Sequence, residues 1–161
     1  MSTNFPLRPQ IVLSPGARVA VIAARFNAHI VDALLSGCVA RLVEHGLSER
    51  VSVYRVPGAF ELPVAAKLAA MTKRYQAVVC IGCVIRGDTP HFDYVAGETA
   101  RGIQQVAIET AVPIIFGVLT VNTEQQALDR TDGTHSHAGV NAADAAVEMI
   151  ALAVEIRVNS H

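Results

Sequence analysis

Four short apolar runs, rich in Val, Ile and Ala, alternate along this chain with segments of helical length. The runs span residues 17–26, 50–56, 75–85 and 112–121. A short, continuous apolar run is typical of a strand that is buried on both faces. Strands that alternate with crossover helices form right-handed βαβ units. The sequence therefore predicts a mostly parallel four-stranded sheet covered on both faces, a three-layer α/β/α sandwich.

The helical segments that we expect span residues 28–46, 57–74 (a loop followed by a helix), 91–111, 123–130 and 141–158. Asn27 can cap the first of them and Gly46 can end it. Apolar residues at helical spacing predict the buried stripe of this first helix. They are Ile30, Leu34, Leu35, Cys38, Val39 and Leu42.

The composition limits the functions and the assembly that we expect for this chain. A length of 161 residues without an internal repeat or linker predicts a single domain over 1–161, with residues 1–16 as an ambiguous leader. Hydrophobic residues make up 52% of the chain and charged residues only 17%, which favours a homo-oligomer. A net charge of −1 argues against a nucleic-acid partner.

The N-terminal segment has no apolar run long enough for a signal peptide or a membrane span, so we expect no membrane partner and a cytoplasmic location. The three cysteines, Cys38, Cys80 and Cys83, fit a reduced compartment without disulfides.

In parallel sheets, ligands bind outside the carboxyl ends of the strands. The segment after the third run holds Gly87, Asp88, Thr89, Pro90 and His91. Free N–H groups at such a strand-to-helix turn can bind a phosphate, and an imidazole beside it can transfer protons near neutral pH. The alternative is that Asp88 and Thr89 only cap a helix and that His91 is a solvated helix-start residue.

Other motifs give weaker evidence for a functional site. Cys80 and Cys83 match a redox C-x-x-C spacing, but they lie in an apolar strand where their side chains point to opposite faces, so we reject that reading. His135 and His137 lack the partners of a metal site, so no metal is expected. Arg130 either reaches an anion or ends a helix on the surface.

Phe26 and Phe60 either stack on a ring or belong to the core. Glu61 is either a polar group in a binding site or an ordinary helix-start acid.

Taken together, "ARFN", "VPGAFELP", "GCVIRGDTPHFDYV", "PIIFGVLTVNTEQQALDR" and "AADAAVEMI" resemble the lumazine synthase family, over residues 18–156. The resemblance implies a flavodoxin-like sheet and a transferase of riboflavin biosynthesis. Its substrates would be 5-amino-6-(D-ribitylamino)uracil and 3,4-dihydroxy-2-butanone 4-phosphate. The products would be 6,7-dimethyl-8-ribityllumazine, inorganic phosphate and water, and no cofactor is implied.

The resemblance also implies roles for individual residues. The backbone of Gly87, Asp88 and Thr89 would hold the phosphate together with Arg130 of a neighbouring subunit, and His91 would transfer protons. The remaining residues would bind the ring and the ribityl chain. They are Phe26, Ala59, Phe60, Glu61, Cys83, Val84, Ile85 and, from the neighbour, Phe116.

Family members assemble as pentamers, decamers or sixty-subunit icosahedral capsids with shared active sites, and some enclose riboflavin synthase. The N-terminal segment, "PQIVLSPG" here, adds a strand to the neighbouring subunit's sheet. This sequence departs from the family at Ala138, where many members have a lysine near the phosphate. His137 could replace that charge, or Arg130 could be the only side-chain cation at the phosphate.

The rival interpretation is a non-catalytic lumazine- or flavin-binding carrier on the same sheet. A flavodoxin-like electron carrier is set aside, because "ARFNAHI" lacks a phosphate loop after the first run.

Overall fold

The first strand, β1 (Val19–Ala24), is buried at every position, as its run of Val, Ile and Ala predicts. We describe the protein from a computed structural model, which covers residues 11–133 and 135–159. β1 lies inside a four-stranded parallel sheet with the order β2-β1-β3-β4. The expectation of a four-stranded parallel sheet is confirmed.

The other strands are β2 (Val51–Val56), β3 (Ala77–Ile85) and β4 (Ile114–Val121). β3 is buried over most of its length because it lies between β1 and β4. β2 is an edge strand, and its central residues are exposed. The apolar content of β2 and β3 thus follows the places of these two strands in the sheet.

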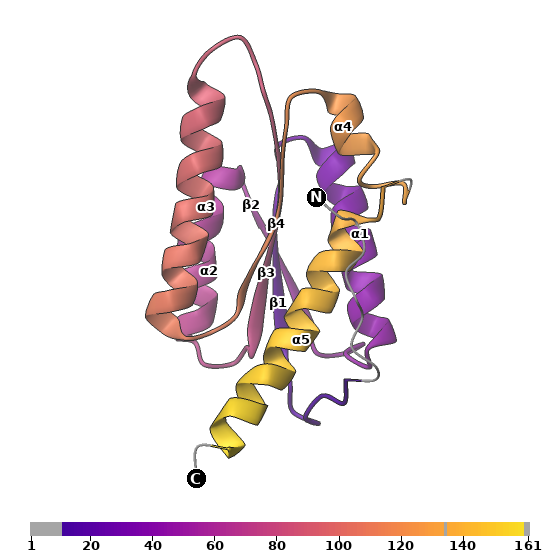
Figure 1. Ribbon diagram of the computed structural model, residues 1–161, viewed down its shortest axis with the longest axis vertical. Coiled ribbons are helices and arrows are strands. Elements are labelled where there is room, and N and C mark those ends of the chain that lie inside the picture. The colour runs from indigo at the N-terminus through magenta and orange to yellow at the C-terminus, as the bar shows by residue number, and fades with distance from the viewer. Residues whose placement is uncertain (1–10, 134, 160–161) are drawn as a thin grey trace.

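The helices form a layer on each face of the sheet (Figure 1). One layer holds α1 (Ala28–Glu44), α4 (Glu124–Leu128) and α5 (Ala138–Val158). The other holds the short 3₁₀ helix η1 (Ala59–Glu61), α2 (Leu62–Met71) and α3 (His91–Thr110). Each layer has its own hydrophobic core against the sheet. The expected three-layer sandwich is confirmed.

The last helix begins three residues earlier than the sequence predicts, at Ala138 rather than at 141. The imidazole of His137 is the reason. Its Nδ1 accepts hydrogen bonds from the backbone N–H groups of Gly139 and Val140, at 3.2 and 3.4 Å. Histidine is an uncommon N-cap, so the sequence pattern did not reveal this helix start.

Helices α1 and α5 approach each other closely because glycines lie at their contact. A Cβ atom at Gly139 would lie 2.0 Å from the carbonyl oxygen of Leu34, and one at Gly37 would lie 2.3 Å from the imidazole of His137. The same interface holds a charged group. Oδ1 of Asp144 accepts hydrogen bonds from Nε of Arg41 and from Nε2 of His45, both at 2.7 Å.

The segment before β1 is not part of the sheet of its own chain over residues 11–16. Ile11 and Leu13 pack against the α1/α5 core instead. The remainder of the leader for which we expect strand exchange, residues 1–10, lies outside the described residues. Within 11–133 and 135–159, no helix is both long and apolar enough to cross a membrane.

Candidate active site

A cleft lies at the carboxyl end of the sheet, beside β1 and β3. These strands are neighbours, but the chain leaves β1 for β2 on one side and leaves β3 for β4 on the other. The loops after two such strands diverge and leave a crevice, where ligands bind in open α/β sheets. A cavity of ≈ 650 Å³ occupies this place, which is within the usual size of a small-molecule site.

Most of the residues that the sequence singles out line this cavity. They are Phe26, Ala59, Phe60, Glu61, Cys83, Val84, Ile85, Gly87, Thr89 and His91. Sequence reasoning did not assign five further lining residues to the site: Asn27, Gly58, Phe92, Tyr94 and Val95. Two of these carry a signal that could have found them. Tyr94 and Val95 follow His91 by three and four residues, so they share its face of α3.

Asn27 connects the two strands that form the crevice. Its side-chain Nδ2 donates a hydrogen bond of 3.0 Å to the carbonyl oxygen of Cys83, at the end of β3. Its backbone is in the left-handed region, with φ of 56°, and its side chain does not cap α1. Asn27 is thus the N-cap residue of α1, as expected, but the cap uses its backbone carbonyl group and not its side chain. Asparagine tolerates this backbone conformation better than most residues.

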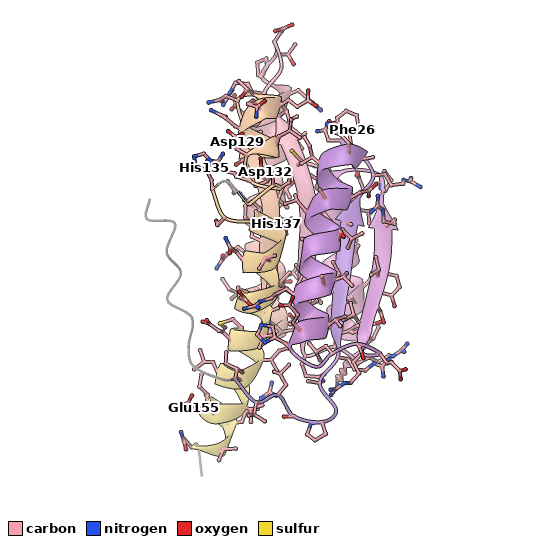
Figure 2. The ribbon with its side chains drawn as sticks, turned by 90° about the vertical axis from the view of Figure 1, so that its right-hand side faces the viewer. Phe26, Asp129, Asp132, His135, His137 and Glu155 are labelled. Atoms are coloured by element: carbon pink, nitrogen blue, oxygen red, sulfur yellow. The ribbon has the colours of Figure 1, made fainter. Side chains whose placement is uncertain are left out.

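Two large aromatic side chains stand at the mouth of the cavity rather than in the core. Phe26 is 71% exposed and Phe60 is 57% exposed. Figure 2 shows Phe26 at the start of α1, away from Asp129 and His135 in the region between α4 and α5. The alternative that these phenylalanines belong to the core is excluded within this chain. An exposed ring beside a cavity is available for stacking on a planar ligand.

The loop between β3 and α3 presents unused backbone donors. Within the described residues, the N–H groups of Gly87, Asp88 and Thr89 have no hydrogen-bond acceptor. The Thr89 hydroxyl accepts a weak hydrogen bond of 3.4 Å from the N–H of His91, which begins α3. Asp88 is exposed and does not line the cavity. Free N–H groups at the start of a twenty-residue helix favour an anion.

Arg86 holds this loop at its base. Its guanidinium lies over the ring of Phe92, 4.2 Å from the ring centroid, and forms an ion pair of 3.2 Å with Asp93. Its Nε donates a hydrogen bond of 3.0 Å to Oδ1 of Asn122, which follows β4. One side chain thus joins the ends of β3 and β4 to the first turn of α3. This restricts the positions that the loop can adopt.

Glu61 combines the two roles that the sequence left open. Its Oε2 accepts a hydrogen bond of 2.9 Å from the N–H of Gly58, at the start of η1. The residue also lines the cavity and is only half-buried. The carboxylate can therefore accept further hydrogen bonds from a polar ligand.

Phe116 and Arg130 lie outside the cavity of their own chain. Phe116 is on the edge strand β4, paired with Cys80, and is 44% exposed. Arg130 follows α4, and its Nη1 donates a hydrogen bond of 2.7 Å to the carbonyl oxygen of Gln126. The structure of one chain does not bring these two residues to the other candidates.

The cysteines do not form a redox pair. Cys80 faces the α2/α3 core and Cys83 faces the α1/α5 core, which confirms that they point to opposite faces of the sheet. All three thiols are free. Burial raises the pKa of Cys38 and Cys80 to about 12. Burial, with a smaller contribution from the Glu124 carboxylate, raises the pKa of Cys83 to about 11. Such thiols are poor nucleophiles near neutral pH.

The loop before α5 does not bring His137 to the cavity of its own chain. The ring packs against Gly37, and its Nδ1 is used by the helix cap. His137 does not line the cavity. Among the described residues, no group of three His, Cys, Asp or Glu side chains is arranged to hold a metal ion.

Comparison with known families gives one match that covers most of the chain. A family model described as 6,7-dimethyl-8-ribityllumazine synthase matches residues 16–153. The matched range contains all the strands and all the residues that line the cavity.

Proposed function

Because the chain belongs to the 6,7-dimethyl-8-ribityllumazine synthase family, we propose that the crevice beside β1 and β3 is its active site. The family's enzymes are transferases of riboflavin biosynthesis. The two substrates are a ribitylaminouracil and a four-carbon butanone phosphate. The crevice must therefore hold a planar ring, a polyhydroxyl chain and a phosphate at the same time.

The observation that carries this proposal is the set of unpaired N–H groups in the 87–89 loop, next to His91. These donors favour binding of the phosphate group of the butanone phosphate, because a phosphate oxygen accepts several hydrogen bonds at once. They bind the phosphate of the substrate and stabilise the inorganic phosphate that leaves.

His91 transfers protons in this scheme. Its side chain lines the cavity and is exposed, so it can exchange protons with solvent. Condensation of the amine with the ketone, elimination of phosphate and ring closure each move a proton between substrate atoms. No covalent bond to the enzyme is needed. Holding two reactants in the correct orientation supplies much of the acceleration, so the loss of His91 slows the reaction without abolishing it.

The ring and the ribityl chain occupy the other parts of the cavity. Phe26 stacks on the pyrimidine ring, whose polar edges bind the main chain of Cys83, Val84 and Ile85. Ala59, Phe60 and Glu61 line the ribityl side, where the carboxylate of Glu61 accepts hydrogen bonds from hydroxyl groups. This arrangement leaves the phosphate end of the cavity to the other substrate.

Phe116 and Arg130 act in the active site of a neighbouring subunit in a homo-oligomer. Their position outside the cavity of their own chain supports this assignment. An arginine from the neighbour would face the phosphate, to which a guanidinium can make two parallel hydrogen bonds. The large apolar side chains exposed on α2 and α3, such as Leu68 and Ile108, also favour an oligomer.

The experiment follows lumazine absorbance with both substrates, against the enzyme-free condensation. We expect His91→Ala and Arg130→Ala homo-oligomers each to be slower than the parent by about tenfold or more. Oligomers co-assembled from the two variants should regain activity above either one, because some sites then combine an intact His91 with an intact Arg130. Mixed oligomers no faster than the average of the two variants would refute shared sites.

Ala138 begins α5 and leaves the phosphate without the lysine that is common in the family. We expect Ala138→Lys to lower the Michaelis constant for the butanone phosphate about threefold to tenfold, because the family resemblance implies a cation near the phosphate at this position. Ala138→Met has a similar stem without charge and serves as the control. Equal constants for the two variants would contradict the role of charge.

The finer assignments complete the proposal. The chain is a single cytoplasmic domain that assembles as a pentamer or as a larger shell of pentamers, and riboflavin synthase is its candidate partner. Residues 1–16 exchange a strand with the neighbour. Deleting them should shift the sedimentation profile to smaller species, and an unchanged profile would reject the exchange.

A further inference from the structure

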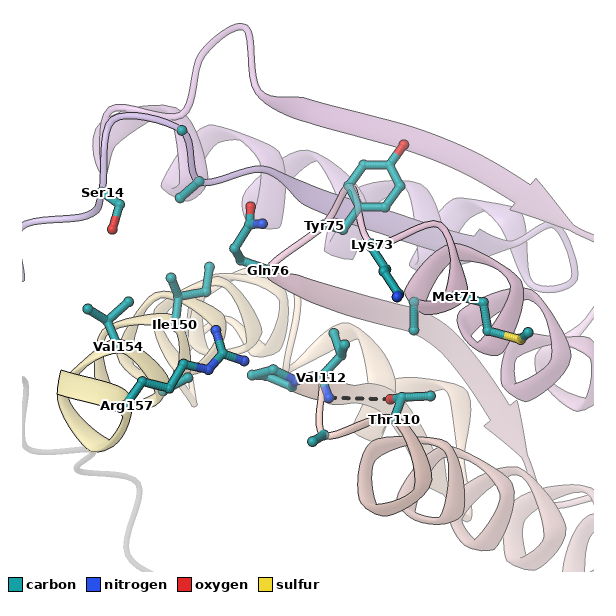
Figure 3. Close-up of a pocket in the computed structure, with 16 residues that line it drawn as sticks. Ser14, Met71, Lys73, Tyr75, Gln76, Thr110, Val112, Ile150, Val154 and Arg157 are labelled. Atoms are coloured by element: carbon teal, nitrogen blue, oxygen red, sulfur yellow. Dashed lines mark hydrogen bonds between the residues drawn. The ribbon is translucent and has the colours of Figure 1, made fainter. Parts of the chain in front are cut away.

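A second cavity, of ≈ 720 Å³, lies at the amino end of the sheet, opposite the proposed active site. Four segments that are distant in the sequence enclose it. They are the residues before β1, the turn between α2 and β3, the turn between α3 and β4, and the last turns of α5 (Figure 3). The proposed reaction uses none of these residues.

The floor of this cavity is buried and mostly apolar. Ala17 and Ile150 belong to the α1/α5 core, and Ala70 and Tyr75 belong to the α2/α3 core, so the cavity spans both layers. All four are buried. Tyr75 is fixed further by a hydrogen bond of 2.6 Å between its hydroxyl group and that of Tyr54.

The charged residues that line this cavity are both basic. Lys73 comes from the turn after α2 and Arg157 from the last turn of α5, and no acidic residue is among the lining residues. Figure 3 shows the two side chains extending into the same space. Within 11–133 and 135–159, neither side chain has an ion-pair or hydrogen-bond partner. The positive charge at this cavity is a local feature, whereas the whole chain has a net charge of −1.

Among the described residues, neither of these two side chains is held by a hydrogen bond at a helix end. A basic residue near a helix C-terminus interacts favourably with the helix dipole and often donates a hydrogen bond to the last carbonyl groups. In the described chain, Lys73 and Arg157 make no such bond. Lys73 also has a backbone φ of 58°, a conformation that glycine adopts at lower cost. The turn nevertheless carries a cationic side chain at this position.

Further polar groups point to the chemistry of a ligand. Oε1 of Gln76 accepts a hydrogen bond of 2.7 Å from the N–H of Arg18, which leaves its side-chain NH₂ group as a donor at the cavity. Arg74 lies beside the ring of Tyr75, 5.9 Å from its centroid, and adds positive charge nearby. Donors and cations thus surround an apolar floor.

We propose that this cavity binds a small organic anion, with its carboxylate or phosphate group between Lys73 and Arg157 and its apolar body against Ile150 and Val112. The volume lies within the range of small-molecule sites. Complementary charge selects the ligand class, and the apolar floor supplies the burial. The site is independent of the proposed active site and does not rest on the proposed reaction.

The test uses benzoate and phenyl phosphate as anionic probes and benzyl alcohol as a neutral probe of similar shape. Crystals soaked with each anion should show it in this cavity, and calorimetric titration should give its affinity. The variant Lys73→Met/Arg157→Met keeps the aliphatic stems and removes both charges. We expect it to bind the anion at this cavity at least about tenfold more weakly.

The control variant Lys67→Met/Arg101→Met removes the same total charge from residues that do not line the cavity. It should bind the probes like the parent. Binding of only one anion assigns the site to a carboxylate or to a phosphate ester. Benzyl alcohol binding as tightly as the anions, or unchanged anion density in the Lys73→Met/Arg157→Met crystals, would overturn the proposal. Lumazine formation by both variants should equal that of the parent, which separates this test from that of the active site.

Discussion

Gly139→Ala is the substitution with the most direct structural prediction. An alanine Cβ at this position would lie 2.0 Å from the carbonyl oxygen of Leu34, 2.8 Å from its carbonyl carbon and 3.1 Å from its Cα. Ordinary van der Waals contact begins near 3.4 Å. The two helices must therefore separate by about 1.4 Å along this line (3.4 minus 2.0), because backbone atoms cannot rotate away as a side chain can.

The expected cost follows from two opposing effects. Overpacking a well-filled interface costs about 1 to 3 kcal/mol, and a contact with backbone belongs at the upper end of that range. Replacing glycine by alanine in a helix returns up to about 1 kcal/mol. We therefore expect Gly139→Ala to lower the free energy of unfolding by about 2 kcal/mol.

The assay is urea unfolding followed by circular dichroism, with all variants at one protein concentration because assembly contributes to the apparent stability. Gly97→Ala is the matched control. Gly97 also lies inside a helix, but a Cβ there meets nothing within 4 Å of its own chain. We expect this control to be as stable as the parent or more stable, by up to about 1 kcal/mol. A Gly139→Ala variant as stable as the control would refute the steric argument.

Three further predictions concern other parts of the molecule. Asp144→Ala removes the acceptor that Arg41 shares with His45. It should lower the free energy of unfolding by about 1 to 3 kcal/mol, and Asp144→Asn should lower it less. The midpoints of urea unfolding measure both effects. Arg86→Met releases the base of the loop over residues 87–89, which we propose binds the phosphate. It should raise the Michaelis constant for the butanone phosphate about threefold to tenfold while kcat changes little, whereas an unchanged constant would contradict the role of Arg86. The pKa of Cys80 is about 12 in the folded chain against an ordinary value of 9.0, so its unfolded thiol ionises first as the pH rises. Stability that is complete below pH 9 should therefore fall progressively toward pH 12, and a Cys80→Ala variant should show a smaller fall in denaturation midpoint over that range.

The sequence predicted the fold well where local pattern and tertiary position agree. β1 and β3 are continuous apolar runs because both faces of each strand are covered, and this pattern is visible without any knowledge of the partner strands. The turn after β3 was predictable for a similar reason. Gly87, Pro90 and His91 follow β3 at its carboxyl end, and open α/β sheets bind ligands outside the carboxyl ends of their strands.

The parts that the sequence did not reveal depend on contacts between distant residues. The amide of Asn27 bonds to Cys83, which lies 56 positions later, and nothing near Asn27 indicates this partner. The cap formed by His137 depends on packing against Gly37 of another helix. Arg86 acts through residues of two different elements. In each case the local pattern allows several conformations, and tertiary packing selects one.

Because β3 is long, the charges at one end of the molecule have little electrostatic effect at the other end. The nine residues of β3, at about 3.3 Å each, place roughly 30 Å between the amino-end cavity and the proposed active site. At physiological ionic strength the Debye length is about 8 Å. The distance between the two cavities is several times this length, so the electrostatic effect of a charge at one cavity is largely screened at the other. Natural selection or protein design can therefore change the charges around the amino-end cavity without altering the electrostatic potential at the proposed phosphate site.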